Sequence, residues 1–311
     1  MKIAFLFPGQ GAQTVGMGKD FYEEYESVKE IYKLAEKETE IEVSSLSFEG
    51  PEEELNQTKN TQICMVTMSL AILELLKKAG IKAEYSAGLS LGEYVALNYA
   101  GAINLKDTLK IIQKRGEYMQ NLAPEGDWSM AAVLGLSDEA VEEVCKKVKT
   151  GFAVPANYNC PGQVAVSGNK VGIQELTELA KEAGAKRVIE LKTSGPFHTE
   201  KLKKASEAFS KELENIEIGK LENIVVKNID AKPYTEKDNI KEILAKHIMS
   251  PVRFSASIKY MLDNGVDTFI EIGPGKVLTS LVKKVSKEVK CINISNVETL
   301  KLAIETLRDN K

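Results

Sequence analysis

The sequence predicts an α/β fold in which a large unit with a parallel sheet carries a smaller inserted unit. Up to about residue 120, short apolar strands alternate with helical segments, which is typical of a parallel sheet. From 127 to 192 the rhythm changes, because two strands follow each other directly. The 311 residues exceed the roughly 100–200 of a typical single domain. We therefore expect a large domain at 1–126 and 193–311 and a small domain at 127–192.

The first part of the large domain begins with a buried strand. Ile3–Phe7 is short and apolar, it is stopped by Pro8-Gly9, and a glycine-rich loop follows. The next elements are predicted in this order: helices at Phe21–Lys37 and Gln62–Ala79, a short strand at Ala83–Ala87, and helices at Glu93–Tyr99 and Asp107–Gln120.

Residues 127–192 predict a unit of their own. Ser137 is a good N-cap, and Asp138 and Glu139 suit the first turn of a helix that runs to about Lys149. The remaining elements are a strand at Ser129–Leu136 before this helix, then strands at Phe152–Tyr158 and Gln163–Ser167, a helix at Val171–Ala183 and a strand at Lys186–Leu191. This β-α-β-β-α-β order is the ferredoxin-like arrangement.

The chain then returns to the large domain. Helices are expected near 199–214 and 239–249. A strand at Thr268–Ile272 stops at Gly273-Pro274-Gly275, and a helix follows at 277–287.

Composition excludes several classes of protein. With 43% hydrophobic and 28% charged residues the chain is not wholly disordered. The net charge of −4 and the lack of a long charge block argue against nucleic acid as a partner. The apolar run Ile63–Leu76 is shorter than the roughly 20 residues that span a bilayer, so it predicts a buried helix and no membrane partner. The four cysteines include no C-x-x-C pair, which predicts no metal site and favours a reduced, cytoplasmic protein.

Gly88-Leu89-Ser90-Leu91-Gly92 matches the G-x-S-x-G pattern and lies between a predicted strand and a predicted helix. In such a turn the glycines permit a tight, strained backbone that exposes the serine hydroxyl. The backbone N–H after the serine can donate to an oxyanion. The sequence therefore predicts Ser90 as a nucleophile.

A nucleophilic serine needs a base, and the chain has only two histidines. His198 lies in a rigid loop that follows the last strand of the small domain. His247 lies in a helix just before Ser250-Pro251. The chain order Ser, Asp, His of α/β-hydrolases would instead combine Ser90 with Asp230 and His247. The residues alone leave both pairings open.

Gln10 and Arg115 each allow a purely structural and a functional interpretation. Gln10 lies between two glycines, where its backbone N–H could reach an oxyanion. A dinucleotide site is not expected there, since Thr14 replaces the third glycine of the fingerprint. Arg115 is one of only four arginines, yet its position alone is better explained by a solvated helix face.

Taken together, seven segments resemble malonyl-CoA:acyl carrier protein transacylases, in the order that this family has. They are Phe7-Pro8-Gly9-Gln10-Gly11-Ala12-Gln13, Gly88-Leu89-Ser90-Leu91-Gly92-Glu93, Arg115-Gly116-Glu117-Tyr118-Met119-Gln120, Asn157-Tyr158-Asn159-Cys160-Pro161-Gly162-Gln163, Pro196-Phe197-His198, Ser250-Pro251-Val252-Arg253 and Glu271-Ile272-Gly273-Pro274-Gly275-Lys276. Each segment alone is modest, but the ordered set covers nearly the whole chain and is highly specific.

The resemblance implies a ping-pong transfer of malonyl groups in fatty acid biosynthesis, without a cofactor. Ser90 would attack the thioester of malonyl-CoA, and His198 would take its proton and later activate the thiol of acyl carrier protein. The N–H groups of Gln10 and Leu91 would hold the oxyanion. Arg115 would pair with the malonyl carboxylate, which suits its planar, bidentate guanidinium.

The resemblance also implies a hydrolase-like large domain whose site is covered by the small domain. Asn157 matches a family asparagine near the site, and His247 stands where most members carry a glutamine that helps to fix the region of the catalytic histidine. Two other departures are Leu89, where His is frequent, and Cys160, where Ser is common. We expect a monomer.

Three alternatives remain open at this point. A serine esterase or thioesterase would use water in place of the thiol. A non-catalytic subunit would bind the carrier protein only, although Ser90 and His198 argue against it. A free-standing acyltransferase of polyketide synthesis would share the same residues, and in the family pattern Phe197 favours malonyl over methylmalonyl.

Overall fold

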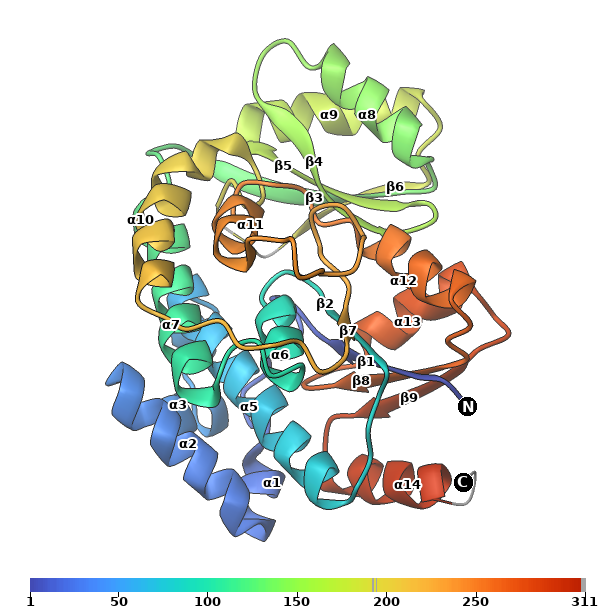
Figure 1. Ribbon diagram of the computed structural model, residues 1–311. Coiled ribbons are helices and arrows are strands. Elements are labelled where there is room, and N and C mark those ends of the chain that lie inside the picture. Colours follow the sequence, from blue (N-terminus) through green and yellow to red (C-terminus); the bar gives the residue numbers. More distant parts are fainter. Residues whose placement is uncertain (192, 194, 309–311) are drawn as a thin grey trace.

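A computed structural model describes residues 1–191, 193 and 195–308, and these residues form two sheets (Figure 1). The larger sheet is parallel and has the strand order β7-β2-β1-β8-β9. Its strands are β1 (Ile3–Phe7), β2 (Tyr85–Gly88), β7 (Ile224–Val225), β8 (Thr268–Ile272) and β9 (Lys290–Ile294). The predicted α/β class and the parallel sheet are therefore confirmed.

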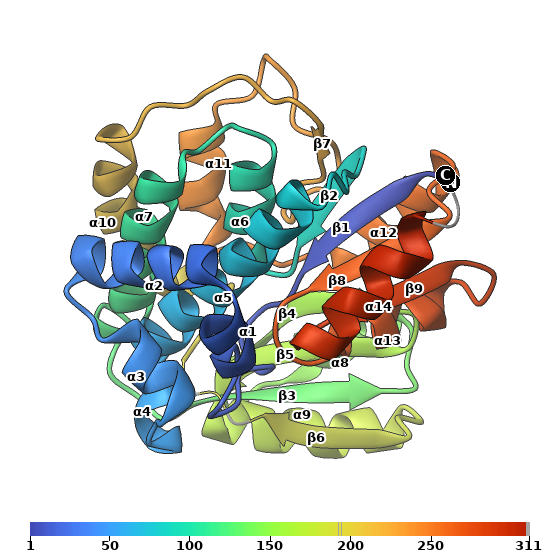
Figure 2. The same cartoon turned by 90° about the horizontal axis from the view of Figure 1, so that it is seen from below.

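Helices cover both faces of this sheet. Seen from below (Figure 2), α2, α5, α6 and α7 lie on one side, and α12 and α13 lie on the other. The helical segments of this part are α1 (Lys19–Glu24), α2 (Glu26–Thr39), α3 (Val43–Phe48), α4 (Glu52–Leu55), α5 (Thr58–Lys78), α6 (Gly92–Tyr99), α7 (Leu105–Asn121), the 3₁₀ turn η1 (Glu200–Leu202), α10 (Lys203–Glu214), α11 (Ile240–His247), α12 (Phe254–Asp263), α13 (Val277–Val285) and α14 (Val297–Arg308).

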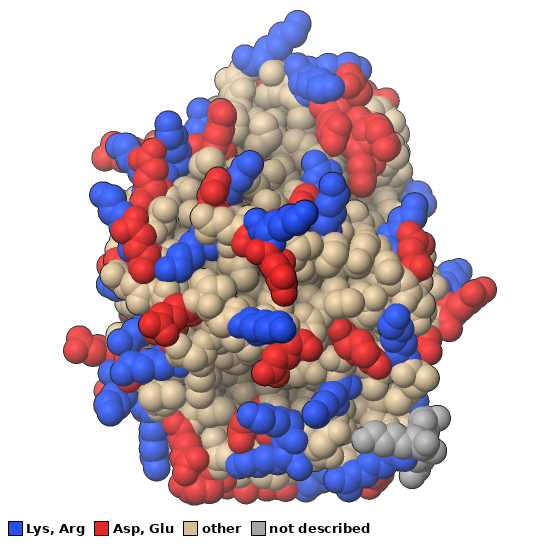
Figure 3. Space-filling view, in the orientation of Figure 1, with Lys and Arg blue, Asp and Glu red and all other residues tan. Residues whose placement is uncertain are grey.

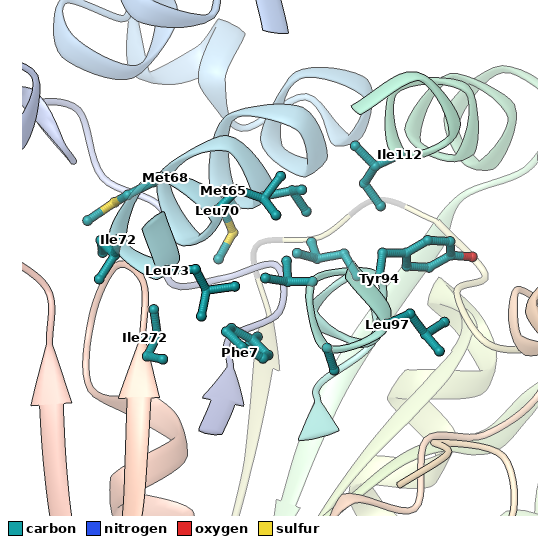
Figure 4. Packing of buried hydrophobic residues seen from close by; sticks show 14 of the residues in the cluster. Phe7, Met65, Met68, Leu70, Ile72, Leu73, Tyr94, Leu97, Ile112 and Ile272 are labelled. Carbon is teal, nitrogen blue, oxygen red and sulfur yellow. The ribbon is translucent and has the colours of Figure 1, made fainter. Parts of the chain in front are cut away.

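The central strand β1 is buried on both faces, which is why it is apolar at every position. Alternate side chains enter different cores: Phe5 and Phe7 belong to the cluster with α5 and α6, whereas Leu6 packs with α12 and α13. Figure 4 shows Phe7 beside Leu73 of α5. The apolar run Ile63–Leu76 lies in α5, and all but one of its residues are buried, as the sequence predicts.

The smaller sheet is antiparallel and has the order β4-β5-β3-β6. Its elements are β3 (Trp128–Leu134), α8 (Asp138–Lys147), β4 (Ala153–Cys160), β5 (Gln163–Asn169), α9 (Lys170–Glu182) and β6 (Arg187–Leu191). The ferredoxin-like order is confirmed, and Ser137 caps α8 by accepting a hydrogen bond from the Ala140 N–H at 3.2 Å. Figure 1 shows α8 and α9 on the outer face of this sheet.

The domain boundaries stay predictions. The elements of the smaller sheet begin at Trp128 and end at Leu191, inside the range 127–192. Residue 192 and the last residues of the large domain, 309–311, lie outside the described residues.

The prediction of one continuous helix at Phe21–Lys37 is wrong. The segment Phe21–Lys37 is divided at Tyr25, whose backbone is extended with φ −122° and ψ 119°. The break lets Tyr22 turn back onto α2, where its ring meets that of Tyr32 edge-on at 5.5 Å. Here tertiary packing outweighs the local helical pattern.

The surface carries no single dominant charge on the face that Figure 3 shows. Lysine and arginine side chains are interspersed there with aspartate and glutamate. Among the described residues, no helix combines the length and the apolar character needed to cross a membrane.

Candidate active site

The loops that follow β1 and β2 meet at one edge of the large sheet. The two strands are parallel neighbours, with Phe7 opposite Gly88, so both loops leave from their carboxyl ends. This edge is where open α/β sheets bind ligands. Both loops line a cavity whose far wall comes from the small sheet, including Ala165 of β5 and Leu191 of β6.

The turn that carries Ser90 can form only because Gly88 and Gly92, the residues at its two ends, have no side chain. A Cβ on Gly88 would lie 1.9 Å from the carbonyl carbon of Gly92, and a Cβ on Gly92 would lie 2.1 Å from the carbonyl oxygen of Phe7. Ser90 has φ 55°, in the left-handed region that non-glycine residues rarely adopt. The strand, the turn and α6 thus have the arrangement that the G-x-S-x-G pattern predicts.

The structure brings His198, and not His247, to the hydroxyl of Ser90. The Oγ of Ser90 lies 2.8 Å from Nε2 of His198. On the other side of the ring, Nδ1 lies 3.2 Å and 3.1 Å from the carbonyl oxygens of His247 and Ser250. Carbonyl oxygens only accept, so Nδ1 carries the proton and Nε2 is free to accept one. Burial, and secondarily the charge of Arg115, lower the pKa of His198 to about 3.

The alternative catalytic triad of Ser90, Asp230 and His247 does not form, because the three side chains do not come together. Asp230 lies at the surface, where its carboxylate is 3.4 Å from Nζ of Lys227. His247 is fully buried beside His198, with 5.3 Å between the ring centroids. Within the described residues its two ring nitrogens have no hydrogen-bond partner. His247 therefore contributes its backbone carbonyl to the site.

Arg115 is fully buried, so the interpretation as a solvated helix face is wrong. Its Nη2 lies 3.0 Å from the Oγ of Ser90, and its Nη1 donates to Oε1 of Gln62 at 2.6 Å. The guanidinium also lies over the ring of Tyr94, 5.2 Å from the centroid. Among the described residues no carboxylate comes within ion-pair distance of Arg115, and its Nε has no partner. Burial lowers the pKa of this guanidinium from its ordinary value.

Three further predicted site residues line this cavity, whereas Arg115 and His247 contact its lining residues without lining it themselves. Gln10 comes from the loop after β1, Leu91 from the turn after β2, and Asn157 from β4. Within the part of the chain that the structure describes, the backbone N–H groups of Gln10 and Leu91 donate to no protein acceptor. Both are thus available to a ligand.

Sequence reasoning missed two polar residues that organise this site. Gln62 anchors Arg115, and the one available signal was a polar side chain inside the apolar run of a buried helix. Asn228 accepts the Ser90 N–H at 2.8 Å; it follows β7, a strand too short to be recognised in the sequence.

Comparison with known proteins agrees with this arrangement. Residues 4–311 match the family model of the acyl transferase domain. A malonyl CoA-acyl carrier protein transacylase of Bacillus subtilis is 48% identical over 310 residues, which are 99% of this chain and 98% of that protein. A relative of the same name from Staphylococcus aureus is 42% identical over 96% of this chain and 97% of its own.

Solved structures give the same result. A malonyl CoA-acyl carrier protein transacylase from Clostridium perfringens has a TM-score of 0.95 at 44% identity, over 100% of this chain and 98% of that one. Another similar structure is a type II PKS acyl-carrier protein in complex with its malonyl-transacylase, with a TM-score of 0.94 at 34% identity, over 98% of this chain and 100% of that one. The resemblance that the seven segments indicate is thereby confirmed, and the chain belongs to the acyl transferase domain family, among the malonyl CoA-acyl carrier protein transacylases.

Proposed function

We propose that this enzyme transfers malonyl groups from malonyl-CoA to acyl carrier protein through a Ser90 acyl-enzyme, as a step of fatty acid biosynthesis. One observation carries the proposal: the Oγ of Ser90 lies 2.8 Å from the Nε2 of His198 and 3.0 Å from the Nη2 of Arg115. A nucleophile, a base and a carboxylate-binding cation thus meet at one atom of the cavity.

In the first half-reaction, Ser90 Oγ forms a bond to the thioester carbonyl carbon while its proton moves to Nε2 of His198. The C–S bond then breaks, and the coenzyme A sulfur takes the proton from His198. The lowered pKa of His198 keeps the ring neutral and able to accept at neutral pH. The carbonyl oxygens of His247 and Ser250 hold the ring in the required tautomer.

In the second half-reaction the phosphopantetheine thiol of the carrier protein replaces coenzyme A. His198 takes the thiol proton, the sulfur attacks the acyl-enzyme carbonyl, and Ser90 leaves as its hydroxyl when His198 returns the proton. Protons balance over the cycle, and no cofactor enters. The N–H groups of Gln10 and Leu91 supply the two donors for the oxyanion in both halves.

Arg115 selects the acyl group in this proposal. A buried guanidinium without a carboxylate partner is costly, and a malonyl carboxylate supplies that partner. A charge-assisted hydrogen bond of this kind is worth about 1.5–3 kcal/mol. Asn157 lies across the cavity and is assigned to binding the same substrate.

The partner and the surroundings follow from the same proposal. The relative that was solved as a complex with a type II PKS acyl-carrier protein supports a carrier protein as the acceptor. The four cysteines are free thiols, which suits the reducing cytoplasm. We expect the enzyme to act as a monomer.

A transfer assay tests the proposal against a thioesterase. Malonyl-CoA is mixed with the enzyme, with and without phosphopantetheinylated carrier protein, and released coenzyme A is compared with malonyl-carrier formed. We expect transfer to exceed hydrolysis by at least about a hundredfold, since a positioned thiol replaces water. Hydrolysis without carrier at a rate near that of transfer would contradict the proposal.

A further inference from the structure

We infer that Asn228 is a positioning residue for acyl transfer, which holds the strained turn of Ser90 in its reactive conformation. The inference rests on the proposed role of Ser90 as the nucleophile. Asn228 is 138 residues away from Ser90 in the chain, and the sequence patterns give it no role in the site.

The side-chain amide of Asn228 holds the turn on both sides of Ser90. Its Oδ1 accepts the Ser90 N–H at 2.8 Å, and its Nδ2 donates to the carbonyl oxygen of Gly88 at 2.7 Å. Only 1% of Asn228 is exposed, so water does not compete for these groups. The sharp turn leaves the Gly88 carbonyl and the Ser90 N–H without partners in the sheet or in α6. One planar amide supplies a hydrogen-bond partner to both groups.

This contact has two consequences for the chemistry. Because the Ser90 N–H is already engaged, it does not serve the oxyanion, and that task is left to the N–H groups of Gln10 and Leu91. The left-handed backbone of Ser90 also persists only when its surroundings fix it, since a residue other than glycine is strained in that conformation. The Asn228 amide is the side chain that fixes it.

Asn228 is itself held by a second layer. Its backbone N–H donates to Oε2 of Glu93 at 2.9 Å, and Oε1 of Glu93 accepts from the hydroxyl of Tyr234. Glu93 is fully buried in the first turn of α6, three residues after Ser90. The contacts therefore connect α6, the turn and the 228–234 segment, which follows β7, into one closed arrangement.

Asn228 acts through Ser90 and not on the substrate. Both polar groups of its side chain are engaged by the backbone of the turn, and Asn228 does not line the cavity beside Ser90. Loss of the amide should therefore slow the chemical step and leave substrate binding nearly unchanged. A role in general stability would lower the melting temperature without this selective effect.

The test compares Asn228→Ala and Tyr234→Phe with Tyr118→Phe. Tyr118 is a matched control because its hydroxyl also donates to a glutamate, Glu212, away from the turn. Each variant is measured for kcat and KM with malonyl-CoA, for melting temperature, and for the rate at which a small fluorophosphonate labels Ser90. Labelling forms an Oγ–P bond and expels fluoride, so it reports the reactivity of Ser90 without recognition of coenzyme A.

We expect Asn228→Ala to lower kcat and the labelling rate together by about ten- to hundredfold, with KM within about threefold of wild type. Tyr234→Phe should lower both by about three- to tenfold, and Tyr118→Phe should lower neither. This pattern supports the inference, provided that the melting temperature shows each variant to be folded under the assay conditions.

Three results would overturn it. If Asn228→Ala is folded and keeps the wild-type kcat and labelling rate, or changes only KM, Asn228 does not position Ser90. If Asn228→Ala does not fold, Tyr234→Phe decides, and an unchanged kcat and labelling rate in that variant overturns the inference. If the wild-type enzyme is not labelled at Ser90 at all, the proposed nucleophile is wrong and the inference falls with it.

Discussion

The guanidinium of Arg115 lies directly against the hydroxyl of Ser90, with 3.0 Å between Nη2 and Oγ. The same oxygen is 2.8 Å from Nε2 of His198, so the hydroxyl accepts from one neighbour and donates to the other. The group proposed to bind the carboxylate thus lies 3.0 Å from the oxygen that forms the bond to the acyl carbon.

Replacement of Arg115 by Ala should lower malonyl loading by about ten- to hundredfold, because the charge-assisted bond is worth about 1.5–3 kcal/mol and 1.4 kcal/mol is a factor of ten. Acetyl-CoA has no free carboxylate, so its loading should hold or improve. The rates are compared by quenched-flow loading of both thioesters. Arg187→Ala is the control, because that side chain is exposed on β6. Equal losses for both substrates would mean that Arg115 serves only the fold.

Replacement of His198 by Ala should lower turnover by at least about a hundredfold, because a general base contributes a factor of roughly 10²–10⁴ to the rate.

In the wild type the pKa of His198 is lowered to about 3, so the ring loses the ability to accept a proton only when the pH falls toward that value. We therefore expect kcat/KM to stay flat from about pH 8 to about pH 5, well below the ordinary histidine value of about 6.5. A fall in kcat/KM centred near pH 6.5, with the protein still folded by circular dichroism, would show that burial does not lower the pKa of His198 in this way.

Replacement of His247 by Gln should keep kcat within about threefold of wild type, because His198 is held by the backbone carbonyl of residue 247, which the substitution preserves. The glutamine amide can donate and accept hydrogen bonds in the same buried place, where the ring nitrogens make no hydrogen bond among the described residues and Nδ1 lies 3.7 Å from Oε2 of Glu93. Steady-state kinetics and a melting curve check this. A folded but inactive His247→Gln variant would give His247 a direct part in the chemistry.

Replacement of Gly92 by Ala should destabilise the protein severely, because the new Cβ would lie 2.1 Å from the carbonyl oxygen of Phe7 and neither backbone can move away cheaply. Gly265→Ala is the matched control: Gly265 has φ 81°, but nothing lies within 4 Å of the added carbon. The control should cost about 1–2 kcal/mol, the price of a left-handed alanine. Urea unfolding compares the two, and a Gly92→Ala protein as stable as Gly265→Ala would show that the turn is more open than described.

The sequence is most informative where the local pattern and the tertiary environment agree. The strand Ile3–Phe7 is predicted with its bounds because a strand buried on both faces must be apolar throughout. The strand β9 (Lys290–Ile294) is missed, because it lies at an edge and is only partly buried, so its pattern is weak. The helix break at Tyr25 is missed because ring packing, and not propensity, causes it.

The candidate site shows the same division. The segment around Ser90 is recognisable because its chemistry needs glycines at fixed spacing. The contacts of Gln62 with Arg115 and of Asn228 with Ser90 join residues that are 53 and 138 positions apart. Such pairs have no local pattern, and only the folded arrangement of α5, α7 and the sheet edge brings them together. The choice between His198 and His247 likewise depends on which ring reaches the turn.

Intact-mass analysis after mixing with malonyl-CoA tests the central claim most directly. The wild-type enzyme should gain the mass of one malonyl group, about 86 Da, and lose it again when phosphopantetheinylated carrier protein is added, since the acyl group passes through a covalent intermediate. Ser90→Ala should show no gain. An adduct of the same mass on Ser90→Ala, or transfer to the carrier protein at the wild-type rate by that variant, would contradict the account.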